Sequence, residues 1–175
     1  MLPIQDMQIR HLGLTEEVAA YFYQAASVCL GRHHSSPVDF ELRAQLRPSV
    51  TVTIQWSPLN QRILGAHANR DDATRDGAYA CALAALEQSE QLFAIRRAEG
   101  RTGADYYVAP VGVPMDDFEN FLRFEVSGID ATGQNINARL HKKVNQVRNG
   151  QINGNLPGLV GIVAFEDKLI LLARA

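Results

Sequence analysis

Two short segments with the character of β-strands each carry one acidic residue. They are "GADYYVAP" (103–110), which contains Asp105, and "RFEVSG" (123–128), which contains Glu125. Residues two apart in a strand share a face, so Glu125 points away from its apolar neighbours, which pack. If the two strands are adjacent, Asp105 and Glu125 can converge on one Mg²⁺ or Mn²⁺ ion, which would also bind water and a substrate phosphate. Such an ion activates water and stabilises the charge that develops on a phosphodiester.

A basic stretch without acidic residues follows the second strand. From Ala131 to Phe165 there is no Asp or Glu, whereas the cations are Arg139, Lys142, Lys143 and Arg148. We expect a helix over 135–150, in which one polar face holds Arg139, Lys142, Gln146 and Asn149. Cations that hold backbone phosphates, placed beside carboxylates that hold a metal, suit a nucleic acid, and DNA is the form we expect.

Both features also have a simpler structural interpretation. An acidic residue in a strand can lie on a solvated face, where Arg123 would neutralise Glu125. A polar helix face can equally be no more than a solvated surface. On this interpretation the chain is an unrelated α/β domain, and the two strands need not be neighbours.

The combination resembles the PD-(D/E)XK nuclease superfamily, which is restriction-endonuclease-like. That family has a helix with an acidic residue, a strand with Asp, a strand with Glu-x-Lys, and then a helix that often supplies Lys or Gln. The matching segments are "GADYYV", "FLRFEVSG" and "INARLHKKVNQV", within roughly residues 72–165. The resemblance implies that Asp105 and Glu125 bind Mg²⁺ with a third acid from the upstream helix, and that Gln146 enters the site. Glu90 is the third acid we expect, with Glu87 and Asp76 as alternatives.

One position departs from the family pattern. Ser127 stands two residues after Glu125, where the family has a Lys that stabilises the reacting phosphate, and a hydroxyl lacks that charge. Either the ammonium comes instead from Lys142 or Lys143 of the following helix, or the site is inactive. The first alternative is a metal-dependent nuclease, with a place in a bacterial system that acts on foreign or mobile DNA. The second is a nuclease-fold module that binds protein or nucleic acid, as a homodimer through its N-terminal helix and hairpin.

The elements around these segments indicate an α/β fold. An amphipathic helix over 14–31 and a hairpin formed by 37–43 and 49–56 precede the core. The core begins with an alanine-rich helix from residue 72 that breaks near Ser89, and a strand follows the break. It ends with apolar strands over 159–165 and 168–175, which form a hairpin. We therefore expect a single domain over 1–175, with an N-terminal part (1–71) and a nuclease-like α/β core (72–175) whose mixed sheet is flanked by helices.

Composition limits the class of protein. The chain has 175 residues, of which 46% are hydrophobic and 21% charged, and a net charge of −2, as in an ordinary globular domain. Cys29 and Cys81 have no metal-ligand spacing, so we expect two buried thiols in a reducing compartment. No stretch resembles a signal peptide or a membrane span, and we expect a cytoplasmic protein without a membrane partner.

Overall fold

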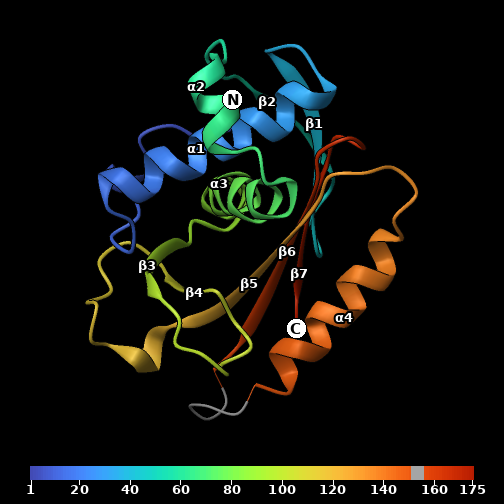
Figure 1. The fold of residues 1–175 in the computed structure, drawn as a ribbon. Coiled ribbons are helices and arrows are strands. Elements are labelled where there is room, and N and C mark those ends of the chain that lie inside the picture. Colours follow the sequence, from blue (N-terminus) through green and yellow to red (C-terminus); the bar gives the residue numbers. More distant parts are fainter. Residues whose placement is uncertain (151–155) are drawn as a thin grey trace.

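The computed structural model describes residues 1–150 and 156–175, and it has a mixed α/β fold (Figure 1). The helices are α1 (Glu16–His33), α2 (Gln61–Ala66), α3 (Arg70–Glu90) and α4 (Ile136–Arg148), with short 3-10 turns at Met7–Ile9 and Phe118–Asn120. The strands are β1 (Val38–Ala44), β2 (Val50–Ile54), β3 (Phe93–Arg97), β4 (Tyr106–Ala109), β5 (Leu122–Ile129), β6 (Gly158–Ala164) and β7 (Leu169–Arg174). The predicted fold class, an α/β domain with helices around a mixed sheet, is confirmed at this level.

Seven strands form one mixed, open sheet in the order β2-β1-β7-β6-β5-β4-β3. The expected hairpins β1–β2 and β6–β7 are both antiparallel pairs. Strands β5 and β6 run parallel, and α4 connects them. The N-terminal hairpin joins the same sheet, because β1 pairs in parallel with β7. The two predicted parts of the chain therefore share one sheet.

Helices α1 and α3 cover one face of the sheet in two layers (Figure 1). Thr15 caps α1 by accepting a hydrogen bond from the backbone N–H of Val18, and Glu16 and Glu17 occupy the first turn of the helix. The two helices approach closely at Gly77 of α3, where a Cβ would lie only 2.8 Å from the backbone nitrogen of Ala26. Small residues on α3, including several fully buried alanines, allow it to lie between α1 and the sheet.

Helix α4 covers the opposite face of the sheet through an apolar stripe, and it leaves its polar side towards solvent. The stripe packs on buried residues of β6 and consists of Ile136, Leu140, Val144 and Val147. Because α3 and α4 lie on opposite faces, side chains at an end of the sheet can meet residues from both helices.

One feature of the N-terminal half was predicted, the end of α3, and another was not, the short helix α2. The expected break near Ser89 is confirmed, since α3 ends at Glu90 and β3 begins at Phe93. The short helix α2 was not predicted, because none of its residues is buried and it has no apolar face to leave a periodic pattern.

Both cysteines are free and buried, as expected. In the part of the chain that the structure describes, no helix is long and apolar enough to cross a membrane.

Candidate functional site

Asp105 and Glu125 come together on neighbouring strands. Strands β4 and β5 are antiparallel, and the last pair in their register is Tyr106 opposite Phe124. Asp105 comes just before this pair and donates its backbone N–H to Phe124 O at 2.9 Å, while Glu125 follows Phe124 on β5, and both carboxylates line the same cavity. The structure therefore confirms that the two acidic strands are adjacent, which the interpretation as an unrelated domain did not require.

The backbone ladder between the two strands stops at Asp105. Its Oδ2 accepts the backbone N–H of Val126 at 2.8 Å, in the position where a strand carbonyl would otherwise stand. Beyond this point β5 has β6 on one side and no β4 residue on the other. The uncovered edge of β5 becomes the floor of a cleft.

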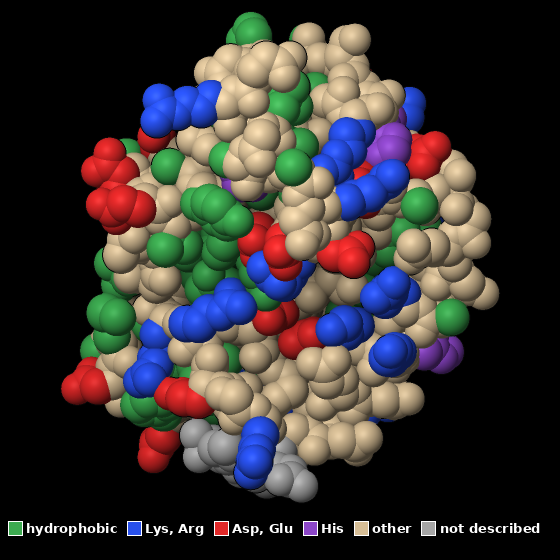
Figure 2. Space-filling model, in the orientation of Figure 1, with side chains coloured by type: hydrophobic (Ala, Val, Ile, Leu, Met, Phe, Trp, Pro, Cys, Tyr) green, Lys and Arg blue, Asp and Glu red, His purple; other side chains and the backbone are tan. Residues whose placement is uncertain are grey.

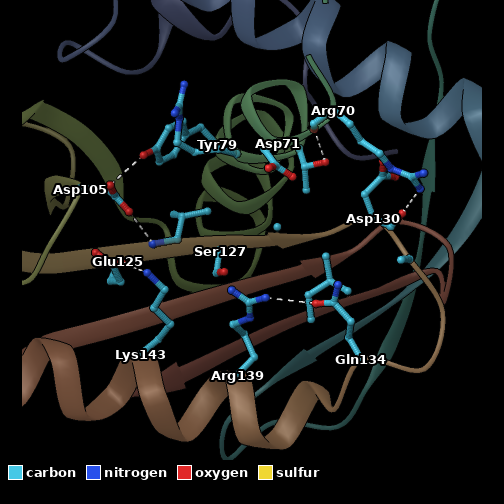
Figure 3. A pocket seen from close by; sticks show the side chains of 16 residues that line it. Arg70, Asp71, Tyr79, Asp105, Glu125, Ser127, Asp130, Gln134, Arg139 and Lys143 are labelled. Atoms are coloured by element: carbon cyan, nitrogen blue, oxygen red, sulfur yellow. Dashed lines mark hydrogen bonds and ion pairs between the residues drawn. The ribbon is translucent and has the colours of Figure 1, made fainter. Parts of the chain in front are cut away.

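The cleft lies between α3 and α4 and has a volume of ≈ 550 Å³. Figure 3 shows Tyr79 and Arg70 entering from α3, Lys143 and Arg139 from α4, and Glu125 and Ser127 on the floor. Figure 2 shows basic and acidic side chains gathered together in the middle of this face of the molecule. The charged residues that line the cleft are Arg70, Asp71, Arg75, Asp105, Glu125, Asp130, Arg139 and Lys143.

Lys143 supplies an ammonium group next to the carboxylates. Its Nζ lies 2.5 Å from Oε1 of Glu125 and 3.1 Å from Oε1 of Gln146. Burial and then the negative charge of Asp105 raise the pKa of Glu125 to about 7, while Lys143 opposes the rise. The structure thus brings together Asp105, Glu125, Lys143 and Gln146, with the lysine on α4 and not at position 127.

Asp105 is held from the α3 side of the sheet. The Tyr79 hydroxyl donates to its Oδ1 at 2.7 Å, and the guanidinium of Arg97 lies 3.6 Å from the same oxygen. Burial and the charge of Asp105 raise the pKa of the Tyr79 phenol, so the phenol remains a donor. These contacts fix the direction in which Asp105 faces the cleft.

The other predicted basic residues of α4 do not all reach the cleft. Lys142 is exposed and does not line it, in contrast to Lys143. Arg148 lies roughly 180° around the helix from Arg139, because successive residues turn by about 100°. Arg139 does line the cleft, where it donates to Gln134 Oε1 at 3.1 Å, and it has no acidic partner within 4.0 Å in the described residues. Arg139 is therefore the predicted phosphate-binding residue that the geometry favours.

The structure does not bring the predicted third acid to this site. Glu90 lies eleven residues after Tyr79 on α3, roughly 16 Å along the helix axis, and pairs with Arg47 at 3.2 Å. Glu87 accepts hydrogen bonds from Arg10 and His11. Of the three candidates only Asp76 is near, but its carboxylate pairs with Arg75 at 2.9 Å and does not line the cleft.

Arg123 does not neutralise Glu125, contrary to the simpler interpretation of the strand. Its side chain is buried and donates to the backbone oxygens of Thr102 and Leu156. It therefore ties the loop before Asp105 to the segment that leads into β6. Gly103 in that loop has φ +70, and a Cβ there would collide with the backbone oxygen of Gln146, so glycine allows the loop to lie against α4.

A second buried carboxylate closes the far end of the cleft. Asp130, at the end of β5, accepts from Arg32 at 2.6 Å and from Arg70 at 2.8 Å, and it lies 2.7 Å from Nε2 of His33. His33 is therefore paired with Asp130, and His34 contacts the backbone oxygen of Phe165.

Two residues that contribute to the site, the aromatic Tyr79 and the cationic Arg97, were not predicted as site residues. Tyr79 is the one aromatic residue in the alanine-rich helix α3, which is the signal that could have identified it. Arg97 has Arg96 and Arg101 close by in the sequence, and no pattern there distinguishes it from them. Its guanidinium carbon lies 4.7 Å from the Tyr79 ring centroid and 4.8 Å from that of Tyr106, which fixes it beside Asp105.

The donor set of the site fits a hard divalent cation that keeps water ligands. Across residues 1–150 and 156–175 no group of three or more His, Cys, Asp or Glu side chains could hold a metal by itself. Two adjacent carboxylates are nevertheless within the range that Mg²⁺ uses when water and phosphate complete its shell. Asp105 and Glu125 are the residues that would hold such an ion.

Comparisons of the chain with protein-family models, with curated proteins and with solved structures found no match. The fold class and the geometry of the cleft are therefore what bears on function.

Proposed function

We propose that the chain hydrolyses phosphodiester bonds of nucleic acid with the help of a divalent metal ion. The observation that carries the proposal is the ammonium of Lys143, 2.5 Å from Glu125, beside a second carboxylate in an open cleft. An ammonium and two carboxylates in one cleft are the charges that metal-assisted phosphoryl transfer requires.

The order of elements supports the resemblance to the PD-(D/E)XK superfamily. An upstream helix is followed by Asp105 immediately before β4, by Glu125 within β5, and then by α4. The ammonium comes from α4 and lies on the same face of the sheet as Ser127. This placement supports the interpretation that the missing lysine has been replaced from the helix.

Each residue has a distinct role in the proposed reaction. A Mg²⁺ or Mn²⁺ ion bound by Asp105 and Glu125 would supply a more acidic water and neutralise charge on the phosphate. Lys143 would donate to the attacking water or to a phosphate oxygen, where its charge stabilises the transition state. Arg139 would hold a neighbouring phosphate of the strand, and Gln146 orients the Lys143 ammonium through their hydrogen bond.

A non-catalytic binding module is the second candidate. The observation that favours it is the closed ion pair between Lys143 and Glu125, which neutralises the buried carboxylate without a metal. In that case the cleft would bind a partner protein, a second copy of the chain or nucleic acid without cleaving it.

Cleavage assays distinguish the two candidates. The purified chain is incubated with Mg²⁺ or Mn²⁺ and with plasmid DNA, single-stranded DNA and RNA, and products are followed on gels. Asp105→Ala, Glu125→Gln and Lys143→Met should each reduce cleavage at least 100-fold, as loss of a principal charge-stabilising group does. Lys142→Met is the matched control, because its side chain is exposed next to Lys143 on the same helix. Undiminished cleavage by the Asp105 or Glu125 variant would refute the assignment, and binding without any cleavage would favour the module.

A further inference from the structure

An open groove rich in aromatic residues adjoins the candidate site on the α1 side. Its volume is ≈ 720 Å³, and we call it the aromatic groove. Asp105 and Tyr79 line both this groove and the cleft, so the two meet at the candidate metal ligand. Figure 2 shows a hydrophobic patch that borders the charged middle of the molecule. The aromatic and apolar lining consists of Val18, Tyr21, Phe22, Tyr79 and Tyr106.

Arg97 places a cation within the aromatic groove. Its guanidinium carbon lies between the rings of Tyr79 and Tyr106, 4.7 and 4.8 Å from their centroids, and its Nη2 donates to the Tyr79 hydroxyl at 3.0 Å. The Arg97 side chain still has 51% of its area exposed. A guanidinium that is held by two aromatic contacts and a hydrogen bond, and that keeps exposed area, is suited to stacking on a planar ring.

Tyr21 on α1 adds a second exposed aromatic surface. It is 43% exposed, although most large apolar residues of α1 are buried. Its ring lies 4.8 Å from that of His67, at a tilt of 44°. The groove therefore offers planar groups on the α1 side and on the β3 side.

Three depressions meet at Asp105, and their chemistry differs. The cleft contains Arg139 and Lys143, a second polar groove of ≈ 480 Å³ contains Arg101 and Asn149, and the aromatic groove contains the planar groups. A nucleotide strand at Asp105 would place phosphates in the two polar depressions and a base in the aromatic one. Bases inside a duplex are stacked and cannot enter such a groove without being flipped out, so this division suits a single strand.

We propose that the aromatic groove binds a nucleobase next to the phosphate at Asp105, and that the substrate is single-stranded nucleic acid. This inference rests on the proposed function of the cleft. Tyr21 and Arg97 stack on the base, and stacking of this kind tolerates any base because each has a planar face.

The test measures stacking separately from cleavage. Binding is measured in EDTA, which prevents metal-dependent cleavage, with a single-stranded DNA oligonucleotide that carries 2-aminopurine and with the matched duplex. Quenching of 2-aminopurine fluorescence reports stacking, and anisotropy reports affinity. Tyr21→Leu and Arg97→Lys should each weaken single-strand binding roughly five- to 100-fold, the range for loss of one stacked base, and reduce the quenching.

Arg96→Lys is the matched control. Arg96 is the neighbouring residue of β3, but its guanidinium lies over Phe118, 5.0 Å from the ring centroid, and it does not line the aromatic groove. This variant should bind and quench like the wild type. Thermal unfolding of each variant verifies that the fold is retained.

The outcomes separate the inference from the proposed function. Weaker single-strand binding in the Tyr21 and Arg97 variants alone supports the inference. Equal affinity for duplex and single strand, with quenching unchanged in both variants, overturns it and leaves metal-dependent duplex cleavage open to its own assay. If neither nucleic acid binds the wild-type chain and none is cleaved, both proposals fail.

Discussion

Replacing Lys143 by methionine isolates what the ammonium does for Glu125. The two groups are 2.5 Å apart, and methionine keeps the length and the apolar stem of the side chain. Burial and the charge of Asp105 already raise the pKa of Glu125 to about 7 against the effect of Lys143. Without the ammonium the pKa of Glu125 should rise further.

The expected change in stability depends on pH. Because the pKa of Glu125 is raised from 4.5 to about 7 on folding, its contribution to stability is fully present below pH 4.5 and is lost as the pH rises to about 7. At about 1.4 kcal/mol per pH unit, the wild type loses about 3 kcal/mol over this interval and nothing more above it. In Lys143→Met the loss continues above pH 7. The variant should therefore match the wild type to within about 1 kcal/mol near pH 6 and become less stable than the wild type above pH 7, by up to about 3 kcal/mol at pH 9.

Urea unfolding in EDTA measures this difference, with the fluorescence of the buried Trp56 as the signal. Lys142→Met serves as the control and should follow the wild type within about 0.5 kcal/mol at every pH, since its side chain is exposed. If the free energies of unfolding of Lys143→Met and the wild type stay parallel up to pH 9, Lys143 does not stabilise the charge on Glu125.

Adding Ser127→Lys to Lys143→Met supplies the missing ammonium from β5 in place of α4. Ser127 is two residues after Glu125 on the same face of β5 and lines the same cleft. The double variant Ser127→Lys with Lys143→Met should regain the wild-type dependence of stability on pH. If the double variant is as unstable near pH 9 as Lys143→Met alone, a lysine at position 127 does not place its ammonium beside Glu125 as Lys143 does.

Three further outcomes are expected elsewhere in the fold. Gly77→Val should lower the free energy of unfolding by about 1–3 kcal/mol in thermal or urea unfolding, because a side chain there would collide with the backbone of Ala26. Burial lowers the pKa of His11 from 6.5 to about 4, so the wild type should lose up to about 3 kcal/mol relative to His11→Gln as the pH falls from 6.5 to 4, measured by urea unfolding. The Cys81 thiol, which is fully buried, should react with a thiol reagent only after unfolding, as followed by absorbance.

The sequence predicts most elements of the fold because their patterns are local. Period-two alternation identifies β1, β2 and β5, and the four apolar residues of α4 identify its buried side. The adjacency of the two acidic strands was an expectation that only the register of β4 on β5 could confirm. Pairing between strands depends on long-range contacts that no short pattern contains.

The choice between neighbouring candidates could not be made from the sequence. Lys142 and Lys143 differ by about 100° around α4, and which of them faces the cleft depends on how the helix is rotated on β6. The upstream acid was predicted on the basis of order along the chain. The position of α3 along the sheet places Tyr79 at Asp105. Glu87 and Glu90 come later on α3, away from the cleft, and pair with Arg10 and Arg47.

The candidate site is assembled from both faces of the sheet, and this follows from the early end of β4. Because the ladder stops at Asp105, this carboxylate can accept from Tyr79 on the α3 side, while Glu125 on β5 accepts from Lys143 on the α4 side. A lysine at position 127 would be fixed to the same strand as Glu125, and its distance from the carboxylate would depend on that strand alone. An ammonium on α4 depends instead on the packing of the apolar stripe against β6, and on Gly103, which lets the loop before Asp105 lie against the end of α4. The charge that the strand lacks is thus present only when α4 is docked, which makes the integrity of the site a property of the packed core and not of one strand.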